Sequence, residues 1–336
     1  MLYFLRLIRS TTDADGLRAR LAVNATYCRD DAQRGRMRRS TPVLLFAGLL
    51  AVGAVAQPAS AAPPSFELPP LMQPPAAEHP GKLIWAEVVT PDLAAAERFY
   101  GGVFGWTFRD IHTGDTHYAI AKLGDAPIAG LLQRPAQPDR RQAAWLPFLS
   151  VSNVQEAGQR VVEHGGKELK PPRAYPLRGK QAIYADPQGA VFAVLNSHSG
   201  DPPDVLAAAG EWIWGAVMTR DPGSAAAFYQ DVFGYEVFEL PSDARGVHLL
   251  LASENYARAS VNPLPQTTDA QPHWIGFVRV IDVAHAAGAA KTFGGRVLVE
   301  PHQDRHGGTV ALLADPAGAA IGVMDWTETT PPGEVK

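Results

Sequence analysis

One pattern of residues occurs twice in this chain, and this repeat limits the possible folds more than any other feature. Eight residues return 129 positions later without a gap: Trp85, Thr90, Asp92, Phe99, Tyr100, Val103, Phe104 and Gly105 recur as Trp214, Thr219, Asp221, Phe228, Tyr229, Val232, Phe233 and Gly234. The same spacing relates Asp186-Pro187-x-Gly189-Ala190 to Asp315-Pro316-x-Gly318-Ala319. A long internal repeat predicts homologous modules, which we assign to residues 81–197 and 211–328, with a linker over 198–210.

Each module reads as two copies of a strand, a helix and three further strands. The apolar, β-branched residues 83–89 predict a strand, and Thr90-Pro91-Asp92 predicts an N-cap, a first-turn proline and an early carboxylate of a helix that ends at Gly105. The remaining strands and helix repeat this order, and we expect them near residues 106–109, 117–122, 128–132, 145–151, 154–164, 168, 181–185 and 191–195. The expected fold class is α+β, with four βαβββ units in the chain.

These motifs resemble those of the vicinal oxygen chelate (VOC) superfamily, which includes glyoxalase I, bleomycin-resistance proteins and extradiol dioxygenases. The resemblance rests on the helix-start Asp92, on Phe99-Tyr100-x-x-x-Phe104-Gly105, and on Asp186-Pro187-x-Gly189-Ala190 before the last strand, all of which occur in both modules. It implies that the two units of a module curl into an incomplete barrel around a cleft. It also implies that the modules pair with each other, as single-module relatives do in a dimer.

Metal-dependent members of that superfamily hold a divalent ion in the cleft with His, Glu or Gln. Here the corresponding positions of the first, fifth and last strands carry no such group, since they fall on Trp85, Trp214, Leu146, Ile275, Ala193 and Gly322. A catalytic metal site needs about three protein ligands with nitrogen, oxygen or sulfur donors. We therefore predict no metal and no other cofactor at these positions.

Two alternatives remain open. A metal-dependent lyase or extradiol-type dioxygenase could use a relocated site at His302 and His306, which lie four residues apart among carboxylates. Pro301 and Gly307-Gly308 predict a loop there, and a loop does not direct both rings at one ion as a helix would. The other alternative is a scaffold protein without catalysis, whose clefts are filled by their own side chains.

The clefts offer aromatic surface in place of metal ligands. Trp85 and Phe148 in the first module, and Trp214 and Phe277 in the second, are expected either to line a ligand cleft or to fill the barrels as core. Glu87 shares a strand face with Trp85 and is the one candidate for a catalytic base. The function we expect is the binding of a small hydrophobic or aromatic molecule; whether catalysis remains, and in which module, stays open.

The N-terminal region has the features of an export signal. Met37-Arg38-Arg39 gives a positive start, residues 42–56 form an apolar run of about 15 residues, and Ala59-Ser60-Ala61 is a small-residue cleavage site. The run is shorter than the roughly 20 residues of a membrane-spanning helix. We interpret residues 1–36 as an upstream extension of the reading frame, 37–61 as a signal peptide, 62–80 as a proline-rich spacer and 329–336 as a tail. The protein is then expected in the periplasm or outside the cell, with no membrane association after cleavage.

The charge balance argues against nucleic acid as a partner. Lys and Arg total 30 against 34 Asp and Glu, a net charge of −4. Loss of residues 1–61 would remove nine Arg and four Asp and leave a net charge of −9. Such a chain has no basic surplus to neutralise phosphates. The one cysteine, Cys28, would also be lost, so we expect neither a disulfide nor a thiolate ligand.

Overall fold

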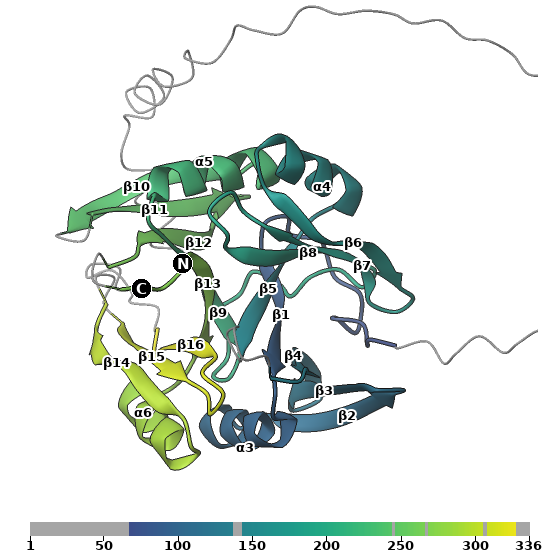
Figure 1. Cartoon of the computed structure of the whole chain (residues 1–336), viewed down its shortest axis with the longest axis vertical. Helices are drawn as coiled ribbons and strands as arrows, with labels where there is room; N and C mark the ends of the chain where they lie inside the picture. The colour runs from purple at the N-terminus through teal and green to yellow at the C-terminus, as the bar shows by residue number, and fades with distance from the viewer. Residues whose placement is uncertain (1–66, 137–142, 244–245, 266–267, 305–307, 327–336) are drawn as a thin grey trace, which may run out of the picture. The chain divides into compact units, whose positions relative to one another are not determined.

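The computed structural model describes residues 67–136, 143–243, 246–265, 268–304 and 308–326, and each module in it forms its own eight-stranded sheet (Figure 1). The prediction of an α+β fold with two βαβββ units in each module is confirmed. The assignments of residues 1–36, 37–61 and 329–336 lie outside the described residues. Among the described helices, none is long and apolar enough to cross a membrane.

Module 1 is built from two units that meet at the centre of its sheet. Its elements are β1 (Leu83–Thr90), α3 (Leu93–Phe104), β2 (Thr107–Thr113), β3 (Thr116–Leu123), β4 (Ala126–Gln133), β5 (Ala144–Ser150), α4 (Val154–Glu163), β6 (Lys167–Tyr175), β7 (Gly179–Ala185) and β8 (Val191–Ser197). The strand order is β2-β3-β4-β1-β5-β8-β7-β6. Strands β1 and β5 pair antiparallel, while β1 with β4 and β5 with β8 pair parallel. Each unit thus closes on its own first strand.

Module 2 repeats this arrangement strand for strand. Its elements are β9 (Trp212–Thr219), α5 (Pro222–Phe233), β10 (Glu236–Asp243), β11 (Gly246–Ser253), β12 (Tyr256–Pro263), β13 (His273–Arg279), α6 (Val283–Thr292), β14 (Arg296–Gln303), β15 (Thr309–Ala314) and β16 (Ala320–Met324). The order is β10-β11-β12-β9-β13-β16-β15-β14. The internal repeat in the sequence therefore corresponds to a repeat in topology.

The N-cap of the first helix of each module lies two residues later than the sequence predicts. Asp92, and not Thr90, is the N-cap of α3: its carboxylate accepts a hydrogen bond from the Ala95 amide at 2.9 Å. Pro91 consequently lies before the helix. Gly105 ends it in the left-handed region at φ 72°, where a residue without Cβ is not strained.

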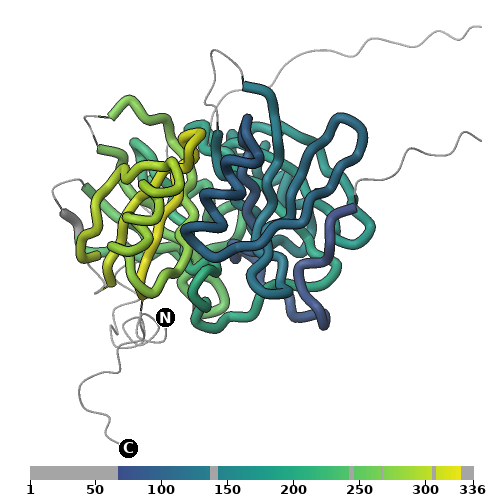
Figure 2. Tube along the Cα trace, turned by 90° about the horizontal axis from the view of Figure 1, so that it is seen from below, coloured from purple at the N-terminus to yellow at the C-terminus, as the bar shows by residue number. Residues whose placement is uncertain are grey.

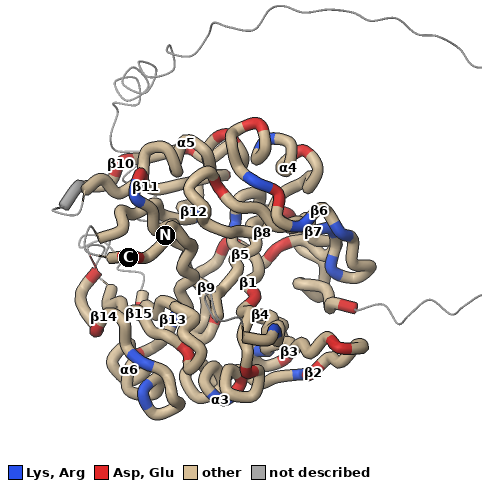
Figure 3. The backbone as a smooth tube through the Cα atoms, viewed as in Figure 1, with Lys and Arg blue, Asp and Glu red and all other residues tan. Residues whose placement is uncertain are grey.

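The edge strand β6 carries several positive charges. Lys167, Lys170 and Arg173 lie along it, in the blue stretch on that side of Figure 3. Charged side chains on a sheet edge oppose pairing with a strand of another molecule.

The two modules share their hydrophobic cores. Helix α3 packs against α6, and α4 packs against α5, so that each helix pair joins one module to the other (Figure 1). One buried cluster combines Phe99, Tyr100 and Trp145 of module 1 with Val283 and Ala290 of module 2, and a second cluster combines the α4 and α5 units. The modules therefore pair within the chain, as expected.

A pair of equivalent hydrogen-bond chains crosses this interface. The Tyr100 hydroxyl donates to Asp315 Oδ2 at 3.0 Å and accepts from Trp145 Nε1 at 2.9 Å. In the reverse direction, the Tyr229 hydroxyl donates to Asp186 Oδ2 at 3.0 Å. The other oxygen of each aspartate accepts amide hydrogens within its own turn, as the sequence predicts for a capping residue. Burial raises the pKa of Tyr100, so its hydroxyl keeps the proton that it donates.

Residues 67–80 fold against module 1. Leu68 and Leu71 are only 2% and 5% exposed and lie in one cluster with Trp85 and Phe148. The purple segment in Figure 2 runs along module 1. The prediction of a proline-rich spacer over 62–80 is therefore wrong for residues 67–80. Composition indicates that the segment forms no helix, but it does not reveal that two leucines fill a cavity of the folded domain.

Substitution of Tyr100 by Phe tests the link between modules. The variant leaves a buried carboxylate oxygen of Asp315 and the Trp145 indole N–H without a partner, so we expect the free energy of unfolding to fall by about 1–3 kcal/mol. Urea denaturation followed by circular dichroism measures the change. Tyr256→Phe is the control, because Tyr256 is partly exposed and lies outside both core clusters. Equal stability of the two variants would contradict the role assigned to the Tyr100 hydroxyl.

Candidate functional site

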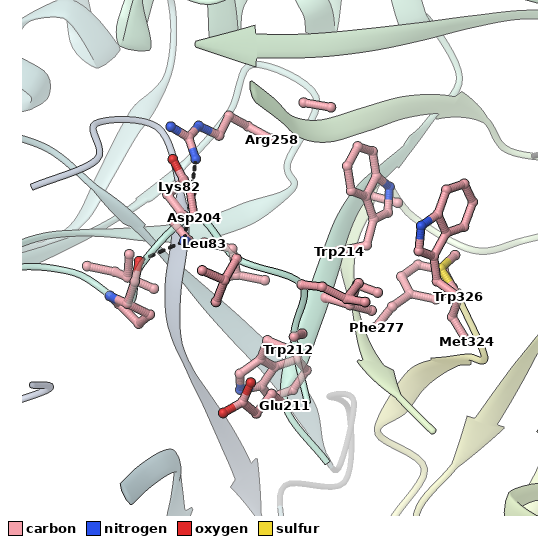
Figure 4. Close-up of a pocket in the computed structure, with 18 of the residues that line it drawn as sticks. Lys82, Leu83, Asp204, Glu211, Trp212, Trp214, Arg258, Phe277, Met324 and Trp326 are labelled. Carbon is pink, nitrogen blue, oxygen red and sulfur yellow. Dashed lines mark hydrogen bonds and ion pairs between the residues drawn. The ribbon is translucent and has the colours of Figure 1, made fainter. Parts of the chain in front are cut away.

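A cavity of about 420 Å³ opens at the mouth of the module 2 barrel (Figure 4). Its walls come from the module 2 strands, from the linker over 202–207, from the edge of module 1 at Leu83 and Ile128, and from Leu71 and Met72 in the segment before module 1. Trp214, Phe277, Met324 and Trp326 gather on one side of it, as Figure 4 shows. The cavity is therefore walled mainly by aromatic and aliphatic groups.

The register of the strands explains the position of these rings. Trp214 on β9 pairs with Phe277 on β13, and Phe277 pairs with Gly322 on β16. A Cβ on Gly322 would lie 2.1 Å from the Phe277 ring, so the ring occupies the space that a side chain on β16 would need. Of the positions expected to carry metal ligands, Trp214 and Gly322 lie in this row, and neither offers a ligand atom.

A polar strip runs along one wall of the cavity. The Ser260 hydroxyl accepts from Trp214 Nε1 at 3.1 Å and from Asn262 Nδ2 at 2.9 Å. Asn262 Oδ1 lies 2.8 Å from His248 Nδ1 on β11. Because the amide nitrogen of Asn262 already donates to Ser260, its oxygen is the acceptor and His248 the donor in this pair. The strip is thus an ordered hydrogen-bond chain beside an apolar surface.

The sequence analysis did not find this strip. Its detectable signal is the alternation of Arg258, Ser260 and Asn262 along β12, since every second residue of a strand faces the same side. None of these residues is a usual metal ligand at the expected spacing, and His248 has no second histidine near it in sequence.

The equivalent space in module 1 is filled. Trp85 and Phe148 are 1% and 0% exposed, whereas Trp214 and Phe277 are partly exposed. Leu68 and Leu71 pack into the same cluster, and the Arg178 guanidinium lies 4.1 Å from the centre of the Trp85 ring. Both expectations for the four rings therefore occur, one in each module: core in module 1, and cavity wall in module 2.

Glu87 is enclosed within module 1. Its Oε1 accepts from the Tyr118 hydroxyl at 2.7 Å and from Trp85 Nε1 at 3.3 Å. Burial raises the pKa of Glu87, although the bond from Tyr118 and the charge of Arg178 oppose this rise. Glu87 does not line the module 2 cavity. Its surroundings fit a buried partner of Tyr118 and Arg178 rather than a base in contact with a ligand.

One residue of the relocated metal site, His302, lies in the described part of the chain. His302 is exposed on β14 and its Nδ1 lies 3.0 Å from the Glu300 carbonyl, while His306 lies outside the described residues. The loop prediction is wrong for residues 300–303, which belong to the strand. Pro301 is tolerated because the pairing of β14 with β15 shifts register between Val299 and His302, where a missing amide hydrogen interrupts no regular ladder.

Three other side chains with possible metal-ligating atoms lie close together near the cavity. In the described part of the chain, His79, Asp204 and Glu254 place possible ligand atoms within 4.8 Å of one another. The same Asp204 carboxylate already binds Lys82 at 2.8 Å and Arg258 at 2.6 Å. These two cations oppose the approach of a further positive ion.

This cluster acts as an ion-pair network between segments far apart in sequence. Burial of the Asp204 carboxyl acts to raise its pKa, but the hydrogen bonds from Arg258 and Lys82 outweigh it and lower the pKa of Asp204 below its ordinary value. Arg258 is itself 5% exposed. The network ties the linker to both modules beside the cavity, in the group of side chains at the upper left of Figure 4. Sequence spacing gave no sign of it, because its members come from three distant segments.

Known proteins resemble both modules. Residues 82–194 match the family described as "Glyoxalase/Bleomycin resistance protein/Dioxygenase superfamily", and residues 215–324 match the "Glyoxalase-like domain". CFP32 of Mycobacterium tuberculosis, which carries the name of a glyoxylase, is 26% identical over 245 residues, covering 71% of this chain and 93% of its own. The anthracycline biosynthesis protein DauV of Streptomyces sp. is 29% identical over 272 residues, covering 75% of this chain and 96% of its own.

Solved structures share the fold at low sequence identity. The Mn(II)-bound glyoxalase from Novosphingobium aromaticivorans gives a TM-score of 0.53 at 16% identity, covering 73% of this chain and 82% of that protein. The 2,3-dioxygenase LapB from Pseudomonas sp. KL28 gives 0.54 at 14% identity, covering 76% and 95%. Together with the duplicated βαβββ topology, these matches show that the chain belongs to the glyoxalase/bleomycin resistance protein/dioxygenase (VOC) superfamily, as a protein of two tandem domains.

Proposed function

We propose that module 2 binds a small, flat and largely apolar organic molecule in its cavity, without a metal ion. The observation that carries this proposal is an open cavity of about 420 Å³ walled by Trp212, Trp214, Phe277 and Trp326. Ligand pockets typically measure about 300–1,000 Å³ and are mainly apolar. Aromatic side chains favour stacked or edge contacts with another ring system.

The polar strip would orient the ligand. Ser260, Asn262 and His248 border the cavity from one wall and offer a hydroxyl, an amide and an imidazole in one connected chain. A few convergent polar groups in an apolar pocket fix the orientation of a ligand that has a hydroxyl or carbonyl group. A hydroxylated aromatic molecule therefore fits this wall better than a pure hydrocarbon.

The names of two relatives point in the same direction. DauV and DnrV, both 29% identical to this chain, are named for anthracycline biosynthesis, and anthracyclines contain a flat ring system with hydroxyl and carbonyl groups. We propose hydroxylated polycyclic aromatic molecules as the ligand class. We also propose that the protein is exported, with residues 37–61 as its signal peptide.

Binding of 1,8-dihydroxyanthraquinone, measured by isothermal titration calorimetry, tests the ligand class. We expect one equivalent to bind the wild type, and Trp214→Leu to weaken binding at least about tenfold, which corresponds to about 1.4 kcal/mol. Leu169→Ala is the control, because Leu169 is 40% exposed on module 1, outside the cavity. Unchanged affinity in Trp214→Leu would contradict a site in module 2.

Elemental analysis of protein purified without chelator separates this proposal from a metal-dependent one. Since the expected ligand positions Trp214, Ile275 and Gly322 offer no metal-ligating atoms, we expect only substoichiometric divalent metal. A stoichiometric ion that is lost in a His302→Ala, His306→Ala variant would instead support a lyase or extradiol-type dioxygenase with a relocated site.

N-terminal sequencing of the product from cell fractions tests export. We expect a mature chain that begins at Ala62 and is found outside the cytoplasm. A product that retains residues 1–61 would refute both the signal peptide and the exported location.

A further inference from the structure

The segment over residues 67–80 occupies module 1 where module 2 has an open cavity. Besides the two buried leucines, it is held by the Ser199 hydroxyl, which accepts from the amides of Leu71 at 2.9 Å and Met72 at 3.1 Å. A backbone hydrogen bond of 2.9 Å joins Ala76 to Ser199. Residues 67–80, all of them described, contain no helix or strand, so this segment depends on these contacts for its position.

The two modules differ at the position that receives the segment. Trp326 borders the module 2 cavity, and the internal repeat places Ser197 at the equivalent site of module 1. Ser197 lies 3.2 Å from Ser199 through their hydroxyls, below the backbone of Leu71 and Met72. A small residue at this point leaves room for the segment, whereas an indole would fill the same space.

Arg178 places a buried guanidinium group inside the filled barrel of module 1. It is fully buried, and its Nε donates to the Pro69 carbonyl at 2.6 Å. Its Nη1 and Nη2 are buried and find no hydrogen-bond partner among the described residues. A guanidinium has five N–H donors, and each buried donor group without a partner costs about 1–3 kcal/mol. The segment thus covers the apolar surface inside module 1 but provides no acceptor for Nη1 and Nη2 of Arg178.

An acidic side chain already interacts with Arg178 in this barrel. The Glu87 carboxyl group interacts electrostatically with Arg178, yet it accepts its hydrogen bonds from Tyr118 and Trp85. A carboxylate from a ligand would place a second acidic group in this buried site and would pay the cost of removing its charge from water. A neutral carbonyl oxygen would accept from the unpaired donors without that penalty.

We propose that residues 67–80 are a displaceable occupant of a second binding site in module 1, and that this site takes a neutral aromatic ketone. The ring would replace the side chains of Leu68 and Leu71 against Trp85 and Phe148, and the ketone oxygen would accept hydrogen bonds from Arg178. The exchange replaces hydrogen bonds and apolar contacts, and it makes or breaks no covalent bond. Leu71 and Met72 also border the module 2 cavity, so the test has to distinguish the two sites, and the Arg178 variant below does this.

The test uses the full chain with Leu68→Asp, which places a charge on the buried side of the segment and should release it. Leu68 itself does not border the module 2 cavity, whereas Leu71 and Met72 do. Gln73→Asp, at an exposed position of the same segment, is the matched control. With acetophenone as the probe, calorimetry should show an additional equivalent that binds Leu68→Asp at least about tenfold more tightly than the wild type or Gln73→Asp, because the wild type must first displace the segment. That equivalent should disappear when Arg178→Met is added.

Hydrogen exchange makes the outcome decisive. Faster exchange of the Leu71 and Met72 amides in Leu68→Asp reports release of the segment, and release without an added equivalent would overturn the proposal. If Leu68→Asp does not fold, the wild type supplies the answer: saturating acetophenone should accelerate exchange of these two amides, and unchanged exchange would overturn displacement. Benzoate should bind the opened site at least about tenfold more weakly than acetophenone. Equal or tighter binding of benzoate would overturn the ligand class.

Discussion

The hydrogen bonds of Tyr100 with Asp315 and of Tyr229 with Asp186 determine how the rest of the molecule is assembled. Each bond joins a buried hydroxyl of one module to a buried carboxylate of the other. Because such groups are costly when unpaired, the bonds favour one relative position of the two modules. That position brings α3 to α6 and α4 to α5, and it completes two cores to which both modules contribute. It also sets the edge of module 1 against the module 2 cavity.

The sequence predicted most of the fold because the relevant signals are local or repeated. Alternating apolar residues located the strands, and the gap-free repeat showed that whatever forms in one module forms in the other. The errors lie where a local signal depends on distant partners. Asp92 caps α3 in place of Thr90, Pro301 lies inside a strand because the pairing there is already irregular, and residues 67–80 are ordered because a cavity receives Leu68 and Leu71.

The candidate site was predicted in outline. Trp214 and Phe277 were identified from strand phase, which is a local property, and both border the cavity. Ser260 and Asn262 were missed because a serine and an asparagine in a strand are common without function, and only the contact with Trp214 and His248 connects them. The filling of module 1 could not be predicted either, since it arises from a segment that precedes both modules.

Covalent linkage of the modules has an evolutionary consequence. In a symmetric dimer of identical subunits, every substitution occurs at both clefts at once. A substitution that fills one cleft therefore fills the other as well. In a tandem chain the copies diverge separately, as Glu87 opposite Ala216 and Ser197 opposite Trp326 illustrate. Gene duplication within one chain has thereby allowed the two modules to change independently. The same fold can then keep an open cavity in one module and a filled interior in the other.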